Sequence, residues 1–233
     1  MHSGRVGGMR VPGHVKERPI LFSAQMVRAL LDGRKTQTRR VIKPAPEVFD
    51  HQVPIRPEPR GGGKWIFMAY SDRPSYQFAT SDRKCPYGVP GDRLWVRETW
   101  RTLRRFDSHK PRNVPAGTMR AYEADAPYIG DCRSAPAGRM GKLRPSIFLP
   151  RWASRITLAI TDVRVQRLQE ISEADARAEG VPYNHACFHD SIQSSIENTA
   201  IRNYAVLWDR LNAKRGYGWD VNPWVWAISF KRP

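Results

Sequence analysis

The segment from Pro223 to Lys231 is apolar on both faces of the strand that it predicts. Large apolar side chains alternate along one side, at Trp224, Trp226, Ile228 and Phe230. Between them, Val225 and Ala227 place small apolar side chains on the other side. A strand that is apolar on both faces has to be covered on both faces. This segment therefore predicts the inside of a barrel or of a covered sheet.

Apolar spacing and turn residues indicate the other elements. Strands are expected at 19–22, at 93–98 and, as a strand pair, at 153–168; helices are expected at 24–32, 173–179 and 192–211. Ser23 and Gly33 suit the two ends of the first helix, and Ser172 with Asp175 resembles a capping box. The alternation in 153–168 changes phase, which predicts a bulge or turn at Thr161–Asp162. The order predicts an α+β fold, a small, partly closed barrel with helices outside.

Two stretches rich in proline and glycine interrupt this pattern. Residues 44–84 begin with five prolines and a triglycine and predict a surface insertion outside the core, with a hairpin near Trp65–Phe67. Residues 101–146 predict a second insertion with little regular structure. Residues 1–18 predict a disordered basic tail. We therefore expect a single domain over 19–233 with two long loop insertions.

Charge is the unusual feature of the composition. Lys and Arg number 39 against 22 Asp and Glu, a formal net charge of +17. The excess lies in residues 1–43 and 85–150, which predicts a basic face around 34–43 and the arginine-rich 101–144. Such a surplus is typical of a polyanion partner, most often nucleic acid, although a merely soluble basic surface is the alternative.

Other features bear on the compartment. No stretch approaches 18 uncharged apolar residues, so no membrane span is expected. The first residues lack the apolar core of a signal peptide. Three scattered cysteines favour a reduced setting. These features predict a cytoplasmic protein.

Three short motifs occur in an order that is typical of one family. The first is Gly33-x-Lys35-x-x-Thr38-x-Arg40, the second Gly91-Asp92 before a strand, and the third the helix that closes with Glu179-Gly180. Together with the aromatic last strand, they resemble the ASCH family, a branch of the PUA-like barrels, over about residues 19–232. The stretch from Cys85 to Trp100 is similar to that of the larger ASCH proteins of bacteriophages and prophages.

The resemblance implies an activity and a site. Some compact bacterial ASCH proteins are amidohydrolases that remove the acetyl group from N4-acetylcytidine, and their Lys, Thr, Arg and Glu match Lys35, Thr38, Arg40 and Glu179. No cofactor is implied. Other ASCH and PUA-like proteins bind RNA, and some cleave it. The two long insertions and the high basicity depart from the compact members.

The residues of the first motif suit this chemistry. Lys35 next to Thr38 is a plausible base and nucleophile, if burial and the neighbouring Arg34, Arg39 and Arg40 lower the Lys pKa. Glu179 would orient Lys35 or protonate a leaving amine. Arg40 would hold a carbonyl or phosphate oxygen, with Arg34 and Arg39 beside it. The alternatives are a solvated or phosphate-binding edge and a surface glutamate at a helix end.

Aromatic and acidic residues near the basic segments are further candidates for substrate binding. Trp100 and Trp152 either stack on an exposed base or lie in the core, and Glu98 either faces the cleft or pairs with Arg97 or Arg101. Three other tryptophans are assigned to the core: Trp95, Trp224 and Trp226.

Metal-assisted chemistry has weak support in the sequence. His185, Cys187 and His189 have the spacing of ligands on a strand, but their segment is typical of a loop, and no fourth ligand is evident. We therefore expect no metal site.

The sequence thus favours a hydrolase that acts on an acylated cytosine, either in a nucleoside or in nucleic acid. The base would have to be unpaired or extruded, because a small cleft cannot reach a stacked one. Two alternatives remain open, a non-catalytic RNA- or DNA-binding module and a nuclease.

Overall fold

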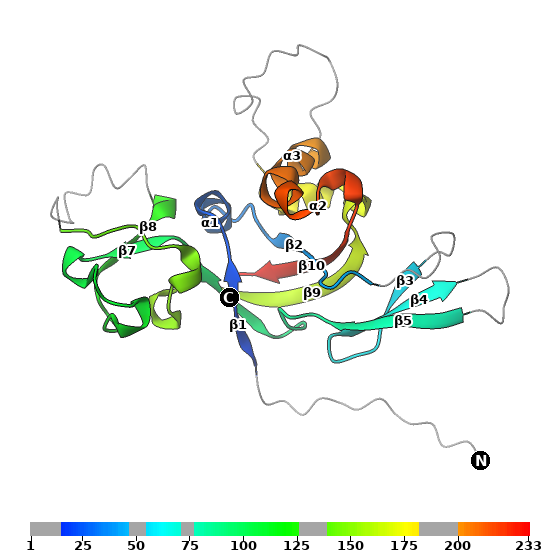
Figure 1. The fold of residues 1–233 in the computed structure, drawn as a ribbon, viewed down its shortest axis with the longest axis horizontal. Helices are drawn as coiled ribbons and strands as arrows, with labels where there is room; N and C mark the ends of the chain where they lie inside the picture. The colour runs from blue at the N-terminus through cyan, green and yellow to red at the C-terminus, as the bar shows by residue number, and fades with distance from the viewer. Residues whose placement is uncertain (1–14, 47–54, 71–76, 126–138, 182–199) are drawn as a thin grey trace, which may run out of the picture.

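A computed structural model describes residues 15–46, 55–70, 77–125, 139–181 and 200–233. The chain forms a mixed α+β fold with more sheet than helix, as predicted (Figure 1). The main sheet has the strand order β1-β6-β9-β10-β2, in which only the β1–β6 pair is parallel. Its strands are β1 (Glu17–Leu21), β6 (Arg93–Arg97), β9 (Thr157–Arg167), β10 (Trp224–Lys231) and β2 (Gln37–Val41).

The hydrogen-bond order of the main sheet runs from β1 to β2 and does not join these two strands into a closed ladder. One side chain spans the gap: Arg40 Nη2, on β2, donates to the carbonyl oxygen of Leu21, on β1, at 2.6 Å. The described residues therefore form a curved sheet with two ends, whereas a partly closed barrel was expected.

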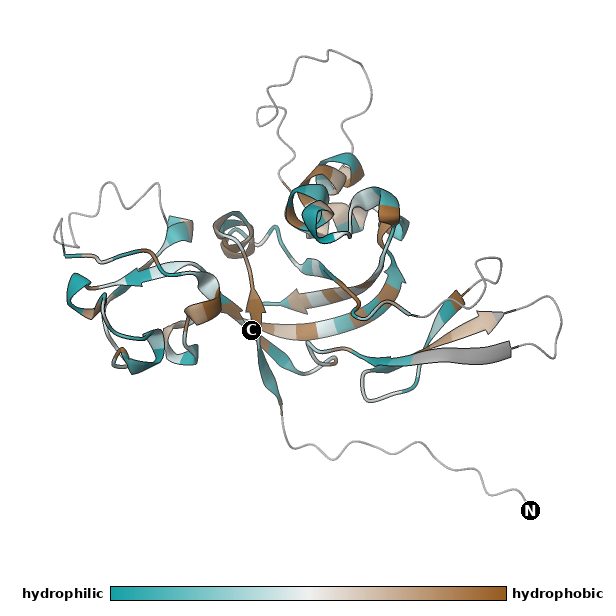
Figure 2. Ribbon diagram, viewed as in Figure 1, coloured by the Kyte–Doolittle hydropathy of each residue, from teal (hydrophilic) through white to brown (hydrophobic). Residues whose placement is uncertain are grey.

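Strand β10 is buried on both faces, as predicted. Its large side chains, such as Trp226 and Ile228, lie in the main core together with residues from β1, α1 (Ala24–Leu31), β6 and β9. Val225 faces the other way and packs with α2 (Glu173–Ala178) and α3 (Ala200–Asn212). Figure 2 shows hydrophobic residues along β10 and on the helices above it. The helical layer is thus the cover that the apolar back of β10 requires.

The helix ends agree with the sequence. Ser23 Oγ accepts a hydrogen bond from the backbone of Met26, and Ser172 Oγ accepts one from the backbone of Asp175. Of the helix expected at 192–211, residues 192–199 lie outside the described residues, and α3 covers the rest. The region 153–168 holds one long strand, β9, and not a pair. The bulge expected there is confirmed, because Ser229 pairs with Asp162 and Phe230 with Ile160, so that Thr161 is passed over.

The first insertion is a structural element and not a loop, which corrects the expectation for 44–84. It forms a three-stranded antiparallel sheet of β3 (Ile55–Pro59), β4 (Lys64–Tyr70) and β5 (Gln77–Lys84). Pro57 and Pro59 are tolerated in β3 because it is an edge strand, where a missing N–H on the outer side breaks no ladder. Phe67 of β4 is fully buried in the main core, its ring 5.5 Å from that of Trp224.

The second insertion is also more ordered than expected. Strands β7 (Trp100–Thr102) and β8 (Arg120–Tyr122) pair, and short 3-10 turns surround them. A separate small core holds this region together: Trp100, Tyr122, Leu149 and Ala153. Glu17 and Arg18, expected in the disordered tail, belong to β1, and the rest of that expectation, residues 1–14, lies outside the described residues.

In the described part of the chain, none of the helices is long and apolar enough to span a membrane.

The contact between Phe67 and Trp224 predicts that the first insertion stabilises the whole domain. Phe67→Ala should lower the free energy of unfolding by about 3–5 kcal/mol, because it leaves a cavity in the main core. Urea unfolding followed by tryptophan fluorescence measures this. Phe148→Ala, at a residue that is 55% exposed, is the matched control and should change the value by less than about 0.5 kcal/mol. Equal effects of the two changes would show that the insertion does not contribute to the core.

Candidate functional site

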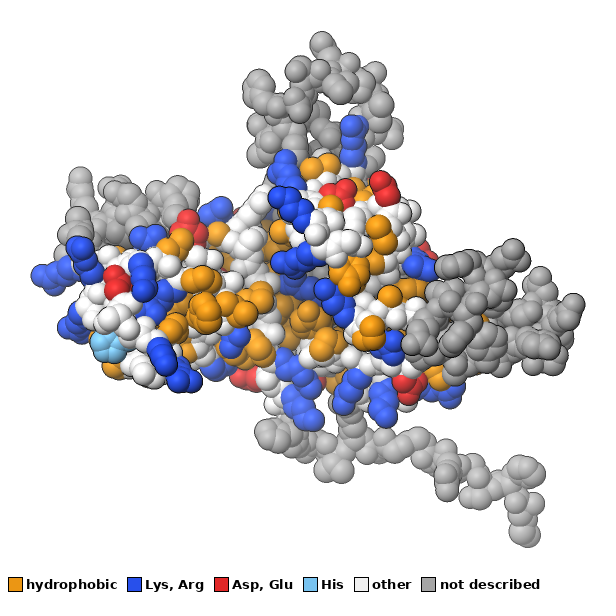
Figure 3. Space-filling view, viewed as in Figure 1, with side chains coloured by type: hydrophobic (Ala, Val, Ile, Leu, Met, Phe, Trp, Pro, Cys, Tyr) orange, Lys and Arg blue, Asp and Glu red, His pale blue; other side chains and the backbone are white. Residues whose placement is uncertain are grey.

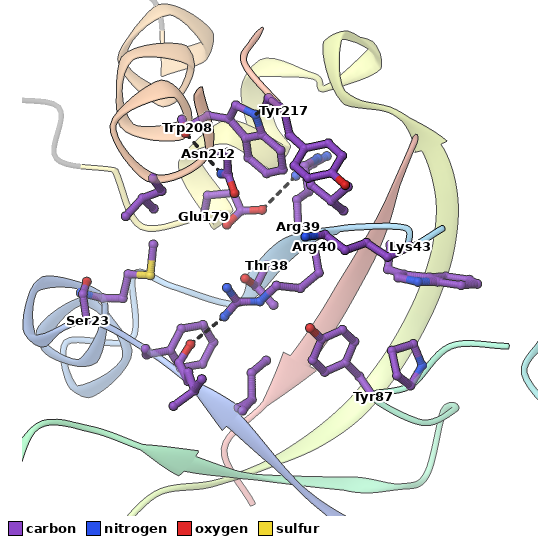
Figure 4. Close-up of a pocket in the computed structure, with 18 of the residues that line it drawn as sticks. Ser23, Thr38, Arg39, Arg40, Lys43, Tyr87, Glu179, Trp208, Asn212 and Tyr217 are labelled. Carbon is purple, nitrogen blue, oxygen red and sulfur yellow. Dashed lines mark hydrogen bonds and ion pairs between the residues drawn. The ribbon is translucent and has the colours of Figure 1, made fainter. Parts of the chain in front are cut away.

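A pocket of about 1040 Å³ lies between the main sheet and α3. Thr38, Arg39 and Arg40 of β2 line it, as do Glu179 at the end of α2 and Tyr204 of α3. Figure 4 shows Thr38 near the middle, with Glu179 on the helical side and Arg40 toward β1. The pocket thus forms where the edge strand β2 meets the helical layer.

Lys35 and Glu179 form an ion pair that is buried behind this pocket. Lys35 Nζ lies 2.8 Å from Glu179 Oε2, and the side chains are 0% and 3% exposed. Nζ also donates to the carbonyl oxygens of Gln37 and Glu179, each at 2.8 Å. All three N–H bonds of the ammonium group therefore have an acceptor. Lys35 itself does not line the pocket, whereas Glu179 does.

The chain brings Glu179 to Lys35 through a backbone bridge and a glycine. Lys35 and Glu179 pair as an isolated β-bridge, and Gly180 follows with φ of +80°. A Cβ at Gly180 would lie 2.8 Å from Lys35 Cβ and 2.9 Å from Ala29 Cβ, so only glycine fits. The closing Glu-Gly of the helix is thus required for close packing against Lys35.

Arg39 completes a buried network of charges on the helical face of β2. Arg39 Nη1 lies 3.2 Å from Glu179 Oε1, and Nη2 lies 2.9 Å from Asp175 Oδ2. Gln37, on the same face, donates to Asp175 and accepts from Arg39. The side chain of Arg39 is fully buried. Arg39, predicted to bind substrate, therefore positions Glu179 in this structure.

Thr38 and Arg40 lie on the opposite face of β2. Thr38 is 2% exposed and pairs in register with Ile228. The guanidinium of Arg40 lies 5.3 Å from the ring centre of Phe22, and its Nε is buried without a hydrogen-bond partner. The two residues are two positions apart on β2 and therefore share a face.

Burial shifts the pKa values of the groups around Glu179. It lowers the pKa of Lys35, and the ion pair with Glu179 only partly opposes this shift. Burial also raises the pKa of Tyr204 well above its ordinary value, and the charge of Glu179 adds to the rise. Tyr204 lies in the part of the helix expected at 192–211 that α3 forms. Its place beside Glu179 depends on how that helix packs and has no local sequence signal.

Several predicted site residues lie outside the pocket. Arg34 is exposed and contacts Asp32 and the carbonyl oxygen of Gly180. Glu98 is 1% exposed, and Arg155 binds it with two hydrogen bonds, at 2.9 and 3.0 Å, in place of the expected Arg97 or Arg101.

The two candidate stacking tryptophans also lie elsewhere. Trp100 is fully buried in the small core of the second insertion, with Trp152 packed edge-on against it at 6.3 Å between ring centres. The ring of Trp100 is therefore not available to an incoming base. The predictions for Trp95, Trp224 and Trp226 are confirmed, since all three are less than 10% exposed.

The metal-like residues His185, Cys187 and His189 lie outside the described residues. Within the described ranges, no group of three or more His, Cys, Asp or Glu side chains is placed to hold a metal ion.

Basic residues dominate the pocket wall beyond the predicted motif. Seven basic residues and one acidic residue, Glu179, line it; the basic ones are Arg39, Arg40, Lys43, Arg83, Lys84, Arg97 and Arg215. Figure 3 shows Lys and Arg side chains gathered in the hollow between α3 and the main sheet. No described residue between 101 and 144 lines the pocket, although a basic face was expected to include that segment. Arg83, Lys84 and Arg215 were missed because they come from segments with little net charge or far from the motif.

Comparisons with protein-family models, with curated proteins and with solved structures found no match to this chain.

The burial of the Lys35–Glu179 pair predicts a large loss of stability when one partner is removed. Lys35→Met should lower the free energy of unfolding by about 3–5 kcal/mol, because it leaves a buried carboxylate oxygen and two carbonyl oxygens without a donor. The control is Arg34→Ala, whose ion pair with Asp32 has the same 2.8 Å separation but exposed side chains. The control should cost less than about 1 kcal/mol. Chemical denaturation of both variants measures the difference, and similar losses would contradict a buried pair.

Asp175 predicts a pH-dependent contribution to stability. Burial alone would raise the pKa of this carboxyl, but Arg164 and Arg39 outweigh burial and hold the pKa below its ordinary value. The stabilisation is therefore full above the unfolded-state pKa of about 4 and disappears as the pH falls through the lower folded-state pKa. Denaturation of wild type and Asp175→Asn between pH 6 and pH 2 should show the wild-type advantage shrinking below pH 4. A gap that stays constant over this range would contradict the ion pairs.

Proposed function

We propose that this chain is a hydrolase of the ASCH type, with a PUA-like barrel, that removes an acyl group, acetyl first of all, from N4 of a cytosine. One observation carries the proposal: Thr38 and Glu179 line one pocket, and Lys35 binds Glu179 directly behind it. Nothing in this chemistry calls for a cofactor.

The curved sheet is compatible with a small barrel of this class. Strands β1 and β2 are its two ends, and Arg40 bridges them through the carbonyl oxygen of Leu21. In the proposal, this bridge closes the barrel where the substrate enters.

The proposed first step is attack by Thr38 Oγ1 on the acyl carbon of the amide. Its proton passes to Lys35 Nζ, which lies against the peptide bond between Gln37 and Thr38 because it binds the Gln37 carbonyl oxygen. Lys35 is a base only when neutral, and burial favours that form. The neutral pair arises when one proton moves from Lys35 to Glu179 along their 2.8 Å hydrogen bond. The step then requires Nζ to turn its freed electron pair from Glu179 toward Thr38 Oγ1 when the substrate is bound.

In that neutral pair, Glu179 is the acid. The carbon–nitrogen bond breaks, Glu179 protonates the leaving exocyclic amine, and the acyl group stays on Thr38 as an ester. Water then hydrolyses the ester, which releases the carboxylic acid and restores the Thr38 hydroxyl. In the proposal, the guanidinium of Arg40, which lines the same pocket as Thr38, stabilises the negative charge on the acyl oxygen.

A second candidate function is a nucleic-acid-binding module without catalysis. The excess of basic residues in the pocket wall favours it, because these residues would bind the phosphates of a nucleic acid whether or not a reaction follows. The two functions differ in their need for Thr38, because a binding module does not use its hydroxyl.

The hydrolase proposal predicts that the wild-type protein releases acetate from N4-acetylcytidine, offered free and within single-stranded RNA or DNA. Thr38→Val removes the nucleophile while keeping the side-chain shape, so kcat should fall by about 100-fold or more. Liquid chromatography of the released cytidine or cytosine base measures the rate.

The matched control for this assay is Thr36→Val, an exposed threonine two residues earlier that does not line the pocket. Its kcat should equal that of the wild type. If the wild type hydrolyses none of these substrates and Thr38→Val still binds nucleic acid as well as the wild type does, the binding module replaces the hydrolase.

A further inference from the structure

We infer that the pocket holds a single-stranded polynucleotide, whose phosphates lie against a cationic strip formed by Lys43, Arg83, Lys84 and Arg215. The inference rests on the proposed function for the identity of the reacting base, and it adds the class of molecule that carries this base. It assigns a role to four residues outside the reaction centre.

The first support is uncompensated charge. Among the described residues, Arg39 is the only basic residue of the pocket wall that forms an ion pair with a carboxylate. The other six make no such pair, and two of them, Arg40 and Arg97, also have a buried Nε without a hydrogen-bond partner. Six like charges around one pocket repel one another in the empty protein, and an anionic ligand relieves that repulsion.

The second support is that the strip is continuous. Arg83 Nε donates to the carbonyl oxygen of Pro44 at 3.2 Å, which places it beside Lys43. Lys43 Nζ lies 4.5 Å from the ring centre of Tyr217, two residues after Arg215. Segments from β5, from the end of β2 and from the turn after α3 therefore meet along one side of the pocket. A row of cations of this kind follows a phosphate backbone, whereas a single cation would suffice for one phosphate.

The third support is the aromatic lining beside the strip. Tyr87 and Tyr217 line the pocket, and both rings are only partly buried. Figure 4 shows them on the same side of the pocket as Lys43. Partly exposed rings next to cations can stack on unpaired bases, whereas the bases of a duplex already stack on one another. The deep position of Thr38, only 2% exposed, likewise requires an unpaired base.

A free nucleoside does not fit these features as well. It has no charge for the six uncompensated cations to bind. The pocket, at about 1040 Å³, is also slightly larger than the range of about 300–1,000 Å³ for sites that take one small molecule. A chain of several nucleotides accounts for both the charge and the volume.

The test is salt-titrated binding of unmodified 12-nucleotide RNA and DNA, single-stranded and as duplexes, measured by fluorescence anisotropy. The wild type should bind a single strand more tightly than the matching duplex, with a steep loss of affinity as salt rises. The double variant Lys43→Ala/Arg215→Ala should bind the single strand at least tenfold more weakly at low salt. The slope of the logarithm of its binding constant against the logarithm of the salt concentration should be shallower by about 1.4, because each of the two lost phosphate contacts contributes about 0.7.

The control is the double variant Lys214→Ala/Lys231→Ala, which removes the same charge from two exposed lysines that do not line the pocket. It should keep the affinity and the slope of the wild type. Circular dichroism and thermal melting of each variant show whether it is folded. Equal losses in the two double variants would mean that net charge alone drives binding, and tighter binding of the duplex would exclude a single-stranded ligand. Either result overturns the inference.

The inference and the proposed function can fail separately, because binding of unmodified strands involves no hydrolysis. Loss of binding in the strip variant, without deacetylation by the wild type, would reject the hydrolase and leave the strip in place. Deacetylation of free N4-acetylcytidine, together with strand binding that does not depend on the strip, would support the hydrolase and reject the inferred role of the strip.

Discussion

The ion pair between Lys35 and Glu179 is the contact on which both the fold and the pocket depend. It joins residues 144 positions apart in the sequence and holds the end of α2 against the start of β2. Charges removed from water are tolerated only when their partners are complete, and here two carbonyl oxygens and Arg39 supply the remaining contacts. With Asp175, the buried part of the network contains two positive and two negative groups, and the exposed Arg164 pairs with Asp175 from the surface. Because it is balanced, it brings Glu179 to the pocket without a net buried charge.

The elements with regular apolar spacing could be predicted from the sequence, and the long-range contacts could not. Strand β10, helix α1 and the bulge at Thr161 follow from local period and turn chemistry. The sheet of the first insertion could not be predicted, because the prolines and glycines of this region indicate turns. The packing of Phe67 against Trp224, which anchors this sheet in the main core, is a contact between distant parts of the sequence. Glu98 shows the same limit, since its partner Arg155 lies 57 residues away and not next to it.

The candidate site likewise contains residues that could be predicted from the sequence and residues that could not. The spacing of Lys35, Thr38 and Arg40 made their grouping predictable, and the resemblance added Glu179 from a distant helix. Tyr204 and Arg215 had no such signal, because their approach to β2 depends on how α3 packs over β10. The main sheet and the helical layer thus carry two kinds of charged surface: a buried, balanced network around Glu179 and an open row of cations along the pocket wall.

The buried side chain of Phe67 also determines geometry. It fixes β4 to Trp224 in the main core, and β5, which carries Arg83 and Lys84, pairs along β4. The separation between these cations and Thr38 is therefore set by a hydrophobic contact, which salt does not screen. In the proposed complex, the first insertion would therefore fix the distance between these cations and Thr38: ionic strength would change how tightly a strand is held, but the nucleotide that reaches Thr38 would stay the same.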